Sequence, residues 1–264
     1  MKYYLIFGLA CSLSFSAHAK SAPMANRLNT SGVRASKSKI PTQNIYYWTG
    51  SINSNISIFI WAIVKDSLIQ GEVTYTKTKI PIPIKLLGHI GKNGEIRVCE
   101  YQKDGEITGV FIFNKLNKSA YGIWASTKSD KEYKFQLSAK DTLVNNMDTI
   151  FQAGKLSGTY SYAFGDKGST GGLTVHEIQK GKISFDISSV TSGPSYNVAE
   201  IETDTVLVSN NEFIYKVPDT DSCFFRIKFY KDFAFIEVLN GYKGCEGAFG
   251  LNATVEGIFY KTKK

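Results

Sequence analysis

The sequence predicts an all-β protein, with two antiparallel β-barrel or β-sandwich modules in tandem after a signal peptide and a flexible tail. Short runs rich in β-branched and aromatic residues follow one another from residue 45, separated by Gly, Asn, Asp or Lys. No stretch shows a convincing helical period. The pattern breaks at 141–154 and restarts, and similar triplets, Thr49-Gly50-Ser51 and Ser157-Gly158-Thr159, lie near the two beginnings.

The N-terminal segment has the composition of an export signal followed by a tail. The apolar run Tyr3–Phe15 precedes Ala17-His18-Ala19, which has small residues at the spacing of a cleavage site. We therefore expect residues 1–19 to be a signal peptide and the mature chain to be periplasmic or secreted, with lipidation at Cys11 as the alternative. Residues 20–44 carry five basic and no acidic residues, which predicts a flexible basic tail that can touch the cell envelope.

The first module is expected over residues 45–140. Pro81 and Pro83 fall within one of its predicted strands, where proline fits only at an edge or a bulge because it has no N–H to donate. The predicted strands are 45–52, 56–64, 69–76, 80–87, 95–101, 107–113, 120–126 and 133–137.

The second module is expected over residues 155–264, after a connector at 141–154. Its last part alternates well, with Phe225, Ile227 and Phe229 on one face of a strand, and Lys231-Asp232 suits a hairpin turn. Gly257 is expected to mark a bulge in the final strand. The earlier predicted strands are 156–162, 172–179, 182–190, 196–203, 205–209 and 212–217.

Removal of a signal peptide leaves three cysteines, Cys99, Cys223 and Cys245. In an oxidising compartment we expect a disulfide between Cys223 and Cys245, which would stabilise the fold by about 3 kcal/mol by restricting the unfolded chain. The odd count leaves Cys99 outside the bridge, and its position in a strand-like run favours a small buried side chain over a reactive thiol.

The sequence offers little catalytic chemistry. Beyond residue 19 it has two histidines, His89 and His176, and it lacks the HExxH, GxSxG and CxxC patterns. We therefore expect no catalytic residues, no metal, no cofactor and no enzyme activity. The competing hypothesis is a sugar hydrolase that uses carboxylates among Glu95, Glu100 and Glu106. No RNA-binding signature orders the aromatic residues, so nucleic acid is not expected as a partner.

Charge differs between the two modules. Residues 45–140 contain 13 basic and 8 acidic residues, whereas residues 141–264 contain 12 and 15. An acidic second module favours a basic protein partner, and we expect Glu200, Glu202 and Asp204 to contact it.

Two passages resemble known proteins. Residues 71–124, with GEVTYTK, GEIRVCEY and GVFIF, resemble a β pattern of uncharacterised exported bacterial proteins. Residues 223–261 resemble the cysteine-bounded ending of small periplasmic proteins of the lysozyme-inhibitor group. Such inhibitors often carry an SGxxY-type loop, and this chain has Ser157-Gly158-Thr159-Tyr160, with one residue fewer between Gly and Tyr. The resemblance implies an exposed binding loop that includes Ser157, Gly158 and Tyr160.

These observations favour an exported, non-enzymatic binding protein that inhibits or neutralises a cell-wall-degrading enzyme or toxin, as an inhibitor or immunity protein does. Its expected partner is another protein, for example a lysozyme-like enzyme. The alternative is a glycan- or envelope-binding module of the periplasm, in which Trp48, Trp61 or Tyr121 stacks on sugars.

Overall fold

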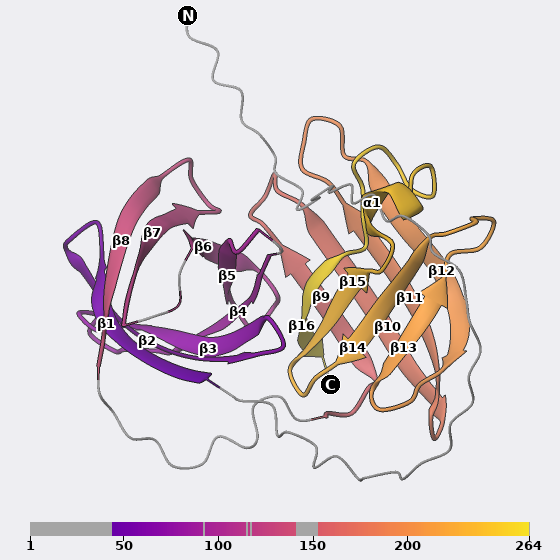
Figure 1. The fold of residues 1–264 in the computed structure, drawn as a ribbon, viewed down its shortest axis with the longest axis horizontal. Helices are drawn as coiled ribbons and strands as arrows, with labels where there is room; N and C mark the ends of the chain where they lie inside the picture. The colour runs from indigo at the N-terminus through magenta and orange to yellow at the C-terminus, as the bar shows by residue number, and fades with distance from the viewer. Residues whose placement is uncertain (1–43, 92, 115, 117, 141–152, 264) are drawn as a thin grey trace, which may run out of the picture.

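A computed structural model of the chain describes residues 44–91, 93–114, 116, 118–140 and 153–263. It confirms the all-β prediction, with two eight-stranded antiparallel barrels in tandem (Figure 1). The predicted signal peptide, almost all of the predicted tail and most of the connector lie outside the described residues. Within the described part of the chain, no helix has the length and apolar character needed to cross a membrane.

The first barrel is closed, and its strands follow in chain order. Each strand pairs with the next, and β1 closes the ring by pairing with β8 from Trp48↔Ala139 to Ile52↔Phe135. The strands are β1 (Asn44–Ile52), β2 (Ile56–Lys65), β3 (Leu68–Tyr75), β4 (Ile84–Ile90), β5 (Ile96–Tyr101), β6 (Ile107–Phe113), β7 (Ser119–Ser126) and β8 (Glu132–Ala139).

Large apolar side chains from alternate strand positions fill the first barrel. Trp48, Phe111 and Phe135 belong to one buried cluster, and the rings of Phe111 and Phe135 meet edge to face at 5.1 Å. Alternation places these residues inside because successive strand side chains point to opposite faces. The interior is therefore a packed core of the kind expected for eight strands.

Four glycines allow the strands of this barrel to bend. Gly50, Gly71, Gly88 and Gly122 lie on four different strands, and a Cβ at any of them would lie 2.0–2.1 Å from a carbonyl oxygen of a neighbouring strand. Glycine is the residue that permits such close backbone approach, and glycine kinks are a known device for closing a barrel. Closure of the barrel thus depends on residues that contribute no side chain to its core.

We predict that Gly122→Ala lowers the free energy of unfolding by about 2–3 kcal/mol, because the added methyl group forces β7 away from the carbonyl of Ile112. Gly172→Ala is the matched control, since a Cβ at Gly172 meets nothing within 4 Å. Urea unfolding measures both variants. Equal stability of the two would contradict a closure role for Gly122.

The second barrel is one eight-stranded sheet in the order β12-β11-β10-β9-β16-β15-β14-β13. Its first and last strands in sequence, β9 and β16, pair in the middle of the sheet, and β12 and β13 form its two margins. The strands are β9 (Gly158–Ala163), β10 (Thr170–Gln179), β11 (Lys182–Val190), β12 (Val198–Leu207), β13 (Glu212–Lys216), β14 (Phe224–Phe229), β15 (Phe233–Val238) and β16 (Gly257–Lys263).

Three local predictions need correction. The runs 196–203 and 205–209 form the single strand β12, whose pairing with β11 contains an irregularity opposite Phe185 and Ile187. Strand β4 begins at Ile84 and not at residue 80, because Pro81 and Pro83 cannot donate to a ladder. Gly257 opens β16, and the irregularity in that strand lies nearer its end, between Lys261 and Lys263.

The predicted disulfide between Cys223 and Cys245 is present, with a Cα–Cα distance of 4.4 Å. It ties the residue before β14 to the segment that follows the single-turn helix α1 (Gly241–Gly244). The same segment reaches the start of β12, where the Gly250 N–H donates to the Val198 carbonyl at 2.9 Å. The disulfide therefore anchors a loop that covers one end of β12.

The two barrels share a buried core. Leu68, Leu87 and Ile107, on the outer face of the first barrel, belong to the same buried cluster as the interior of the second. The Tyr101 hydroxyl donates to the Ile258 carbonyl of β16 at 2.9 Å, and Cys99 packs half-buried against this cluster. The contact lies against β9, β15 and β16, the middle strands of the second sheet, as Figure 1 shows.

Candidate functional site

The residues of the expected binding loop lie in and beside β9. Tyr160 is fully buried, and its hydroxyl donates to the Leu156 carbonyl at 2.7 Å. The Ser157 hydroxyl accepts a hydrogen bond from the Glu177 N–H at 2.8 Å. Gly158 has φ +147, and a Cβ there would lie 2.4 Å from the Lys263 carbonyl oxygen. The expectation of an exposed loop that presents Tyr160 is therefore wrong, because this side chain belongs to the core of the second barrel.

The three acidic residues expected to contact a partner lie together on β12, and all are exposed. Ala199 and Ile201 point into the barrel and are buried, so the alternating Glu200 and Glu202 point outward. Asp186 lies opposite the irregularity in the neighbouring strand β11, which adds a third carboxylate to this outward face. The strand is flanked by exposed apolar side chains, with Leu207 77% exposed.

One margin of β12 forms no backbone ladder with another strand among the described residues. The Asn197 carbonyl accepts from the Thr191 N–H on the β11 side, whereas the Val198 carbonyl accepts from the Gly250 N–H on the other side. Because backbone groups alternate in direction along a strand, those of Glu200 point away from β11, and the irregularity after Ile201 ends this regular alternation. We call the margin from Glu200 to Leu207 the open edge of β12.

Side chains, and not a backbone ladder, bring the two margins of the sheet together. The Tyr215 hydroxyl of β13 donates to the Asp204 carboxylate of β12 at 2.7 Å. This bond and a second from the Thr205 N–H lower the pKa of Asp204. Burial, and then the bond to Asp204, raise the pKa of Tyr215 to about 12. A single bridge between Ser209 and Glu212 joins the strands where the chain turns.

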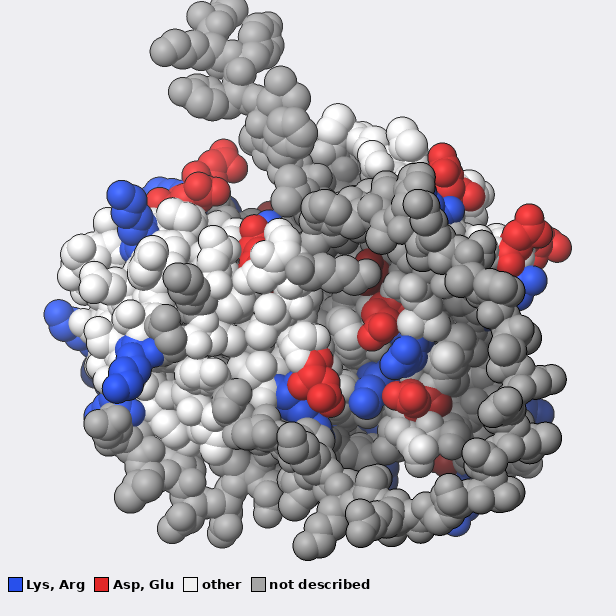
Figure 2. Space-filling model, viewed as in Figure 1, with Lys and Arg blue, Asp and Glu red and all other residues white. Residues whose placement is uncertain are grey.

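Four acidic residues, Asp186, Glu200, Glu202 and Asp204, lie on the neighbouring strands β11 and β12. Figure 2 shows acidic and basic side chains mixed over the face that it draws, without one large acidic surface. A partner that recognises this charge therefore needs to approach the open edge closely, since exposed charges are screened over about 8–10 Å at physiological salt.

A second polar cluster lies inside the first barrel. Glu100 is 2% exposed, and its carboxylate accepts hydrogen bonds from Tyr75 at 2.6 Å, Trp124 at 3.2 Å and Thr108 at 3.3 Å. A Cβ at Gly109 would lie 2.7 Å from Glu100 Oε2, so this glycine makes room for the cluster. Burial raises the pKa of Glu100, while the three hydrogen bonds lower it.

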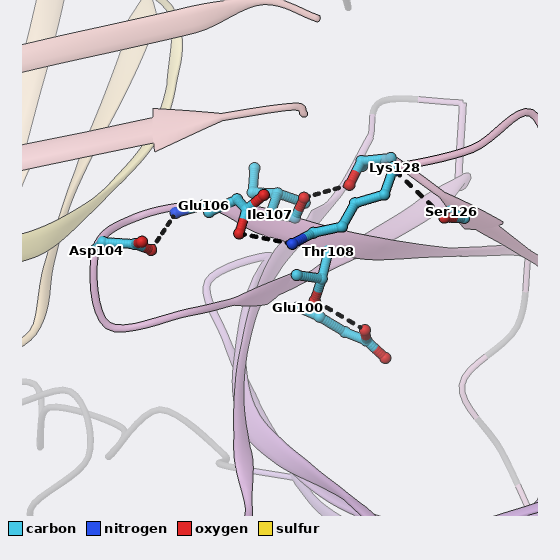
Figure 3. Close-up of polar contacts among 8 residues, drawn as sticks. Glu100, Asp104, Glu106, Ile107, Thr108, Ser126 and Lys128 are labelled. Atoms are coloured by element: carbon cyan, nitrogen blue, oxygen red, sulfur yellow. Dashed lines mark hydrogen bonds and ion pairs between the residues drawn. The ribbon is translucent and has the colours of Figure 1, made fainter. Parts of the chain in front are cut away.

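The three carboxylates considered for sugar hydrolysis have separate partners. Figure 3 shows Glu100 against Thr108, while Glu106 pairs with Lys128 at 3.0 Å. Glu95 pairs with Arg97 at 2.5 Å. Glu100 is thus a satisfied buried group that fixes three neighbouring side chains inside the barrel.

We predict that Glu100→Gln changes how stability depends on pH. A raised folded-state pKa means that the stability associated with Glu100 is fully present below its ordinary pKa of 4.5 and is lost as pH rises through the folded-state value. The wild type should therefore lose stability relative to Glu100→Gln as pH rises above 4.5. Urea unfolding between about pH 4 and 8 measures the difference, with exposed Glu132→Gln as the control for loss of one charge. A wild type that gains stability relative to Glu100→Gln as pH rises would contradict this prediction.

A shallow hollow of about 640 Å³ lies on the outer face of the first barrel. Tyr121, at its margin, is 73% exposed. Of the other aromatic residues considered for sugar stacking, Trp48 is buried, and Trp61 is half-buried and donates to Glu72 at 3.1 Å. The hollow is lined by Ser51, Ser54, Tyr121, Gly122, Ile123, Lys134, Phe135 and Gln136.

The two histidines lie apart from both clusters. His89 packs against Phe235 at 6.5 Å, and burial lowers its pKa, while His176 is exposed on β10. Among the described residues, no three His, Cys, Asp or Glu side chains are placed to hold a metal ion.

Comparison of the chain with protein-family models, curated proteins and solved structures gives no match. The class of this protein is therefore defined by its fold and surface, a tandem of two antiparallel β-barrels with an acidic marginal strand. The sequence indicated the acidic residues of β12, but it did not indicate the open edge or the Asp204–Tyr215 contact, since both depend on which strands pair.

Proposed function

We propose that this chain is a non-enzymatic, exported binding protein that inhibits or neutralises a basic cell-wall-degrading enzyme or toxin. The observation that supports this proposal is the open edge of β12, which carries outward carboxylates of Glu200 and Glu202. The predicted signal peptide and the likeness of residues 223–261 to lysozyme inhibitors support the same class of function.

The geometry suits recognition by charge. Carboxylates on an exposed strand attract a basic partner and orient it as it approaches. The strand is held firmly, since β11 pairs along its inner margin and the disulfide-anchored loop contacts Val198. Support of this kind lowers the entropic cost of binding, because the contacting residues are already ordered.

We predict that the oxidised protein captures a basic enzyme from periplasmic extract and slows its hydrolysis of peptidoglycan. Glu200→Gln with Glu202→Gln should weaken capture by about tenfold at physiological salt, because two attractive charges are lost. Asp130→Asn with Glu132→Gln, at exposed positions of the first barrel, removes the same charge and should leave capture unchanged. Failure to recover a partner at physiological salt, or equal capture by both double variants, would count against the proposal.

The second candidate is glycan binding, favoured by the exposed Tyr121 ring beside the hollow on the first barrel. Aromatic faces flanked by hydroxyl, amide and ammonium groups are suited to sugars. Cosedimentation with peptidoglycan discriminates the two candidates. Binding that is lost in Tyr121→Ala and retained without the β12 carboxylates would support the glycan alternative.

A further inference from the structure

We propose that the open edge of β12 binds an extended, basic segment of a partner protein as an added β-strand. The inference rests on the proposed function and specifies the contact, with main-chain hydrogen bonds for affinity and the β12 carboxylates for selectivity. The occupant is thus a Lys- or Arg-bearing stretch able to lie in extended conformation.

The backbone of β12 presents the groups that such a strand needs. The N–H and carbonyl groups of Glu200 point away from β11, as the alternation from Asn197 and Val198 requires before the irregularity that follows Ile201. Within the described residues, other segments make backbone contacts with this side of β12 at its two ends, from Gly250 to Val198 and at the turn between Ser209 and Glu212. Between these ends the Thr205 N–H donates to the Asp204 carboxylate. The open edge from Glu200 to Leu207 is about 25 Å long at 3.3 Å per residue.

The edge lies away from the first barrel, and β13 reaches it where Tyr215 donates to Asp204. The first barrel packs against β9, β15 and β16, in the middle of the second sheet, whereas β12 is one of its two margins. Figure 1 shows β12 on the side of the second barrel away from the first. A strand can therefore approach β12 without displacing the first barrel.

Charge decides between a foreign strand and a second copy of β12. Antiparallel pairing of two β12 strands would bring Glu200 and Glu202 against carboxylates of the other copy, and like charges placed opposite one another destabilise a sheet. A basic strand replaces this repulsion with attraction. The acidic residues thus protect the edge from self-association and select its occupant.

Two substitutions of Glu200 separate the contribution of backbone hydrogen bonds to peptide binding from that of charge. Glu200→Pro removes the outward N–H, while the hydrogen-bonding positions toward β11, at Ala199 and Ile201, keep their groups. Glu200→Gln removes the same charge and keeps the N–H. Circular dichroism and urea unfolding show whether both variants retain the fold.

The probe is a fluorescent peptide of about eight residues that alternates Lys and Thr, in a plain form and in a form N-methylated at alternate residues. N-methylation retains the charge and blocks one row of backbone donors. We expect the plain peptide to bind the oxidised full-length protein and to protect the Glu200 amide from hydrogen exchange. Binding should weaken by about tenfold or more with the N-methylated peptide. Glu200→Pro should bind the plain peptide about tenfold less tightly than Glu200→Gln.

Three results would overturn the inference. The first is equal binding of the plain and N-methylated peptides, which would show attraction by charge alone and would leave the proposed function standing. The second is that the double variant Glu200→Gln with Glu202→Gln dimerises and no longer binds the peptide. This result would mean that the carboxylates only prevent self-association. The third is a Glu200 amide that is protected from hydrogen exchange even without peptide, and that loses this protection when the five basic residues of 20–44 are replaced by Gln. This result would make the chain's own segment the occupant of the edge.

Discussion

The apolar contact between the two barrels is the constraint on which the arrangement depends. Leu68, Leu87 and Ile107 are buried on the outer face of the first barrel, where an isolated barrel would expose them to water. Tyr101 adds a hydrogen bond to Ile258, which satisfies its buried hydroxyl. Around this contact lie an ion pair between Lys85 and Asp232 at 3.4 Å and a backbone bond from the Ala163 N–H to the Gly105 carbonyl at 3.1 Å. We therefore expect the two barrels to unfold together as one unit.

This contact also decides which surfaces remain for binding. It covers the middle strands of the second sheet, and these include β9, where Ser157 to Tyr160 were expected to bind. The margins of the sheet, β12 and β13, lie outside this contact, and the Tyr215 hydroxyl joins them by donating to Asp204. In the first barrel the closed ladder leaves no margin among the described strands, so its candidate surface is the hollow beside Tyr121. The two barrels thus offer different kinds of contact.

Local features of the fold were predictable from the sequence, and long-range ones were not. Alternation of Phe225, Ile227 and Phe229 predicts a strand with one buried face, and Cys223 and Cys245 predict the disulfide, because both signals lie close together in the chain. Burial of Tyr160 was missed because a short motif does not show which strand lies beside it. The environment of Glu100 was missed for the same reason, since its partners Tyr75 and Trp124 are 25 and 24 residues away.

The most direct test of one shared folded unit uses the three tryptophans, all in the first barrel, as reporters of a change made in the second. Replacing Cys223 and Cys245 with Ala removes the disulfide and should cost about 3 kcal/mol. The account predicts that urea unfolding followed by tryptophan fluorescence shifts to lower urea by the same amount as unfolding followed by far-ultraviolet circular dichroism. A tryptophan transition that stays at the wild-type midpoint while the circular dichroism transition moves would contradict it.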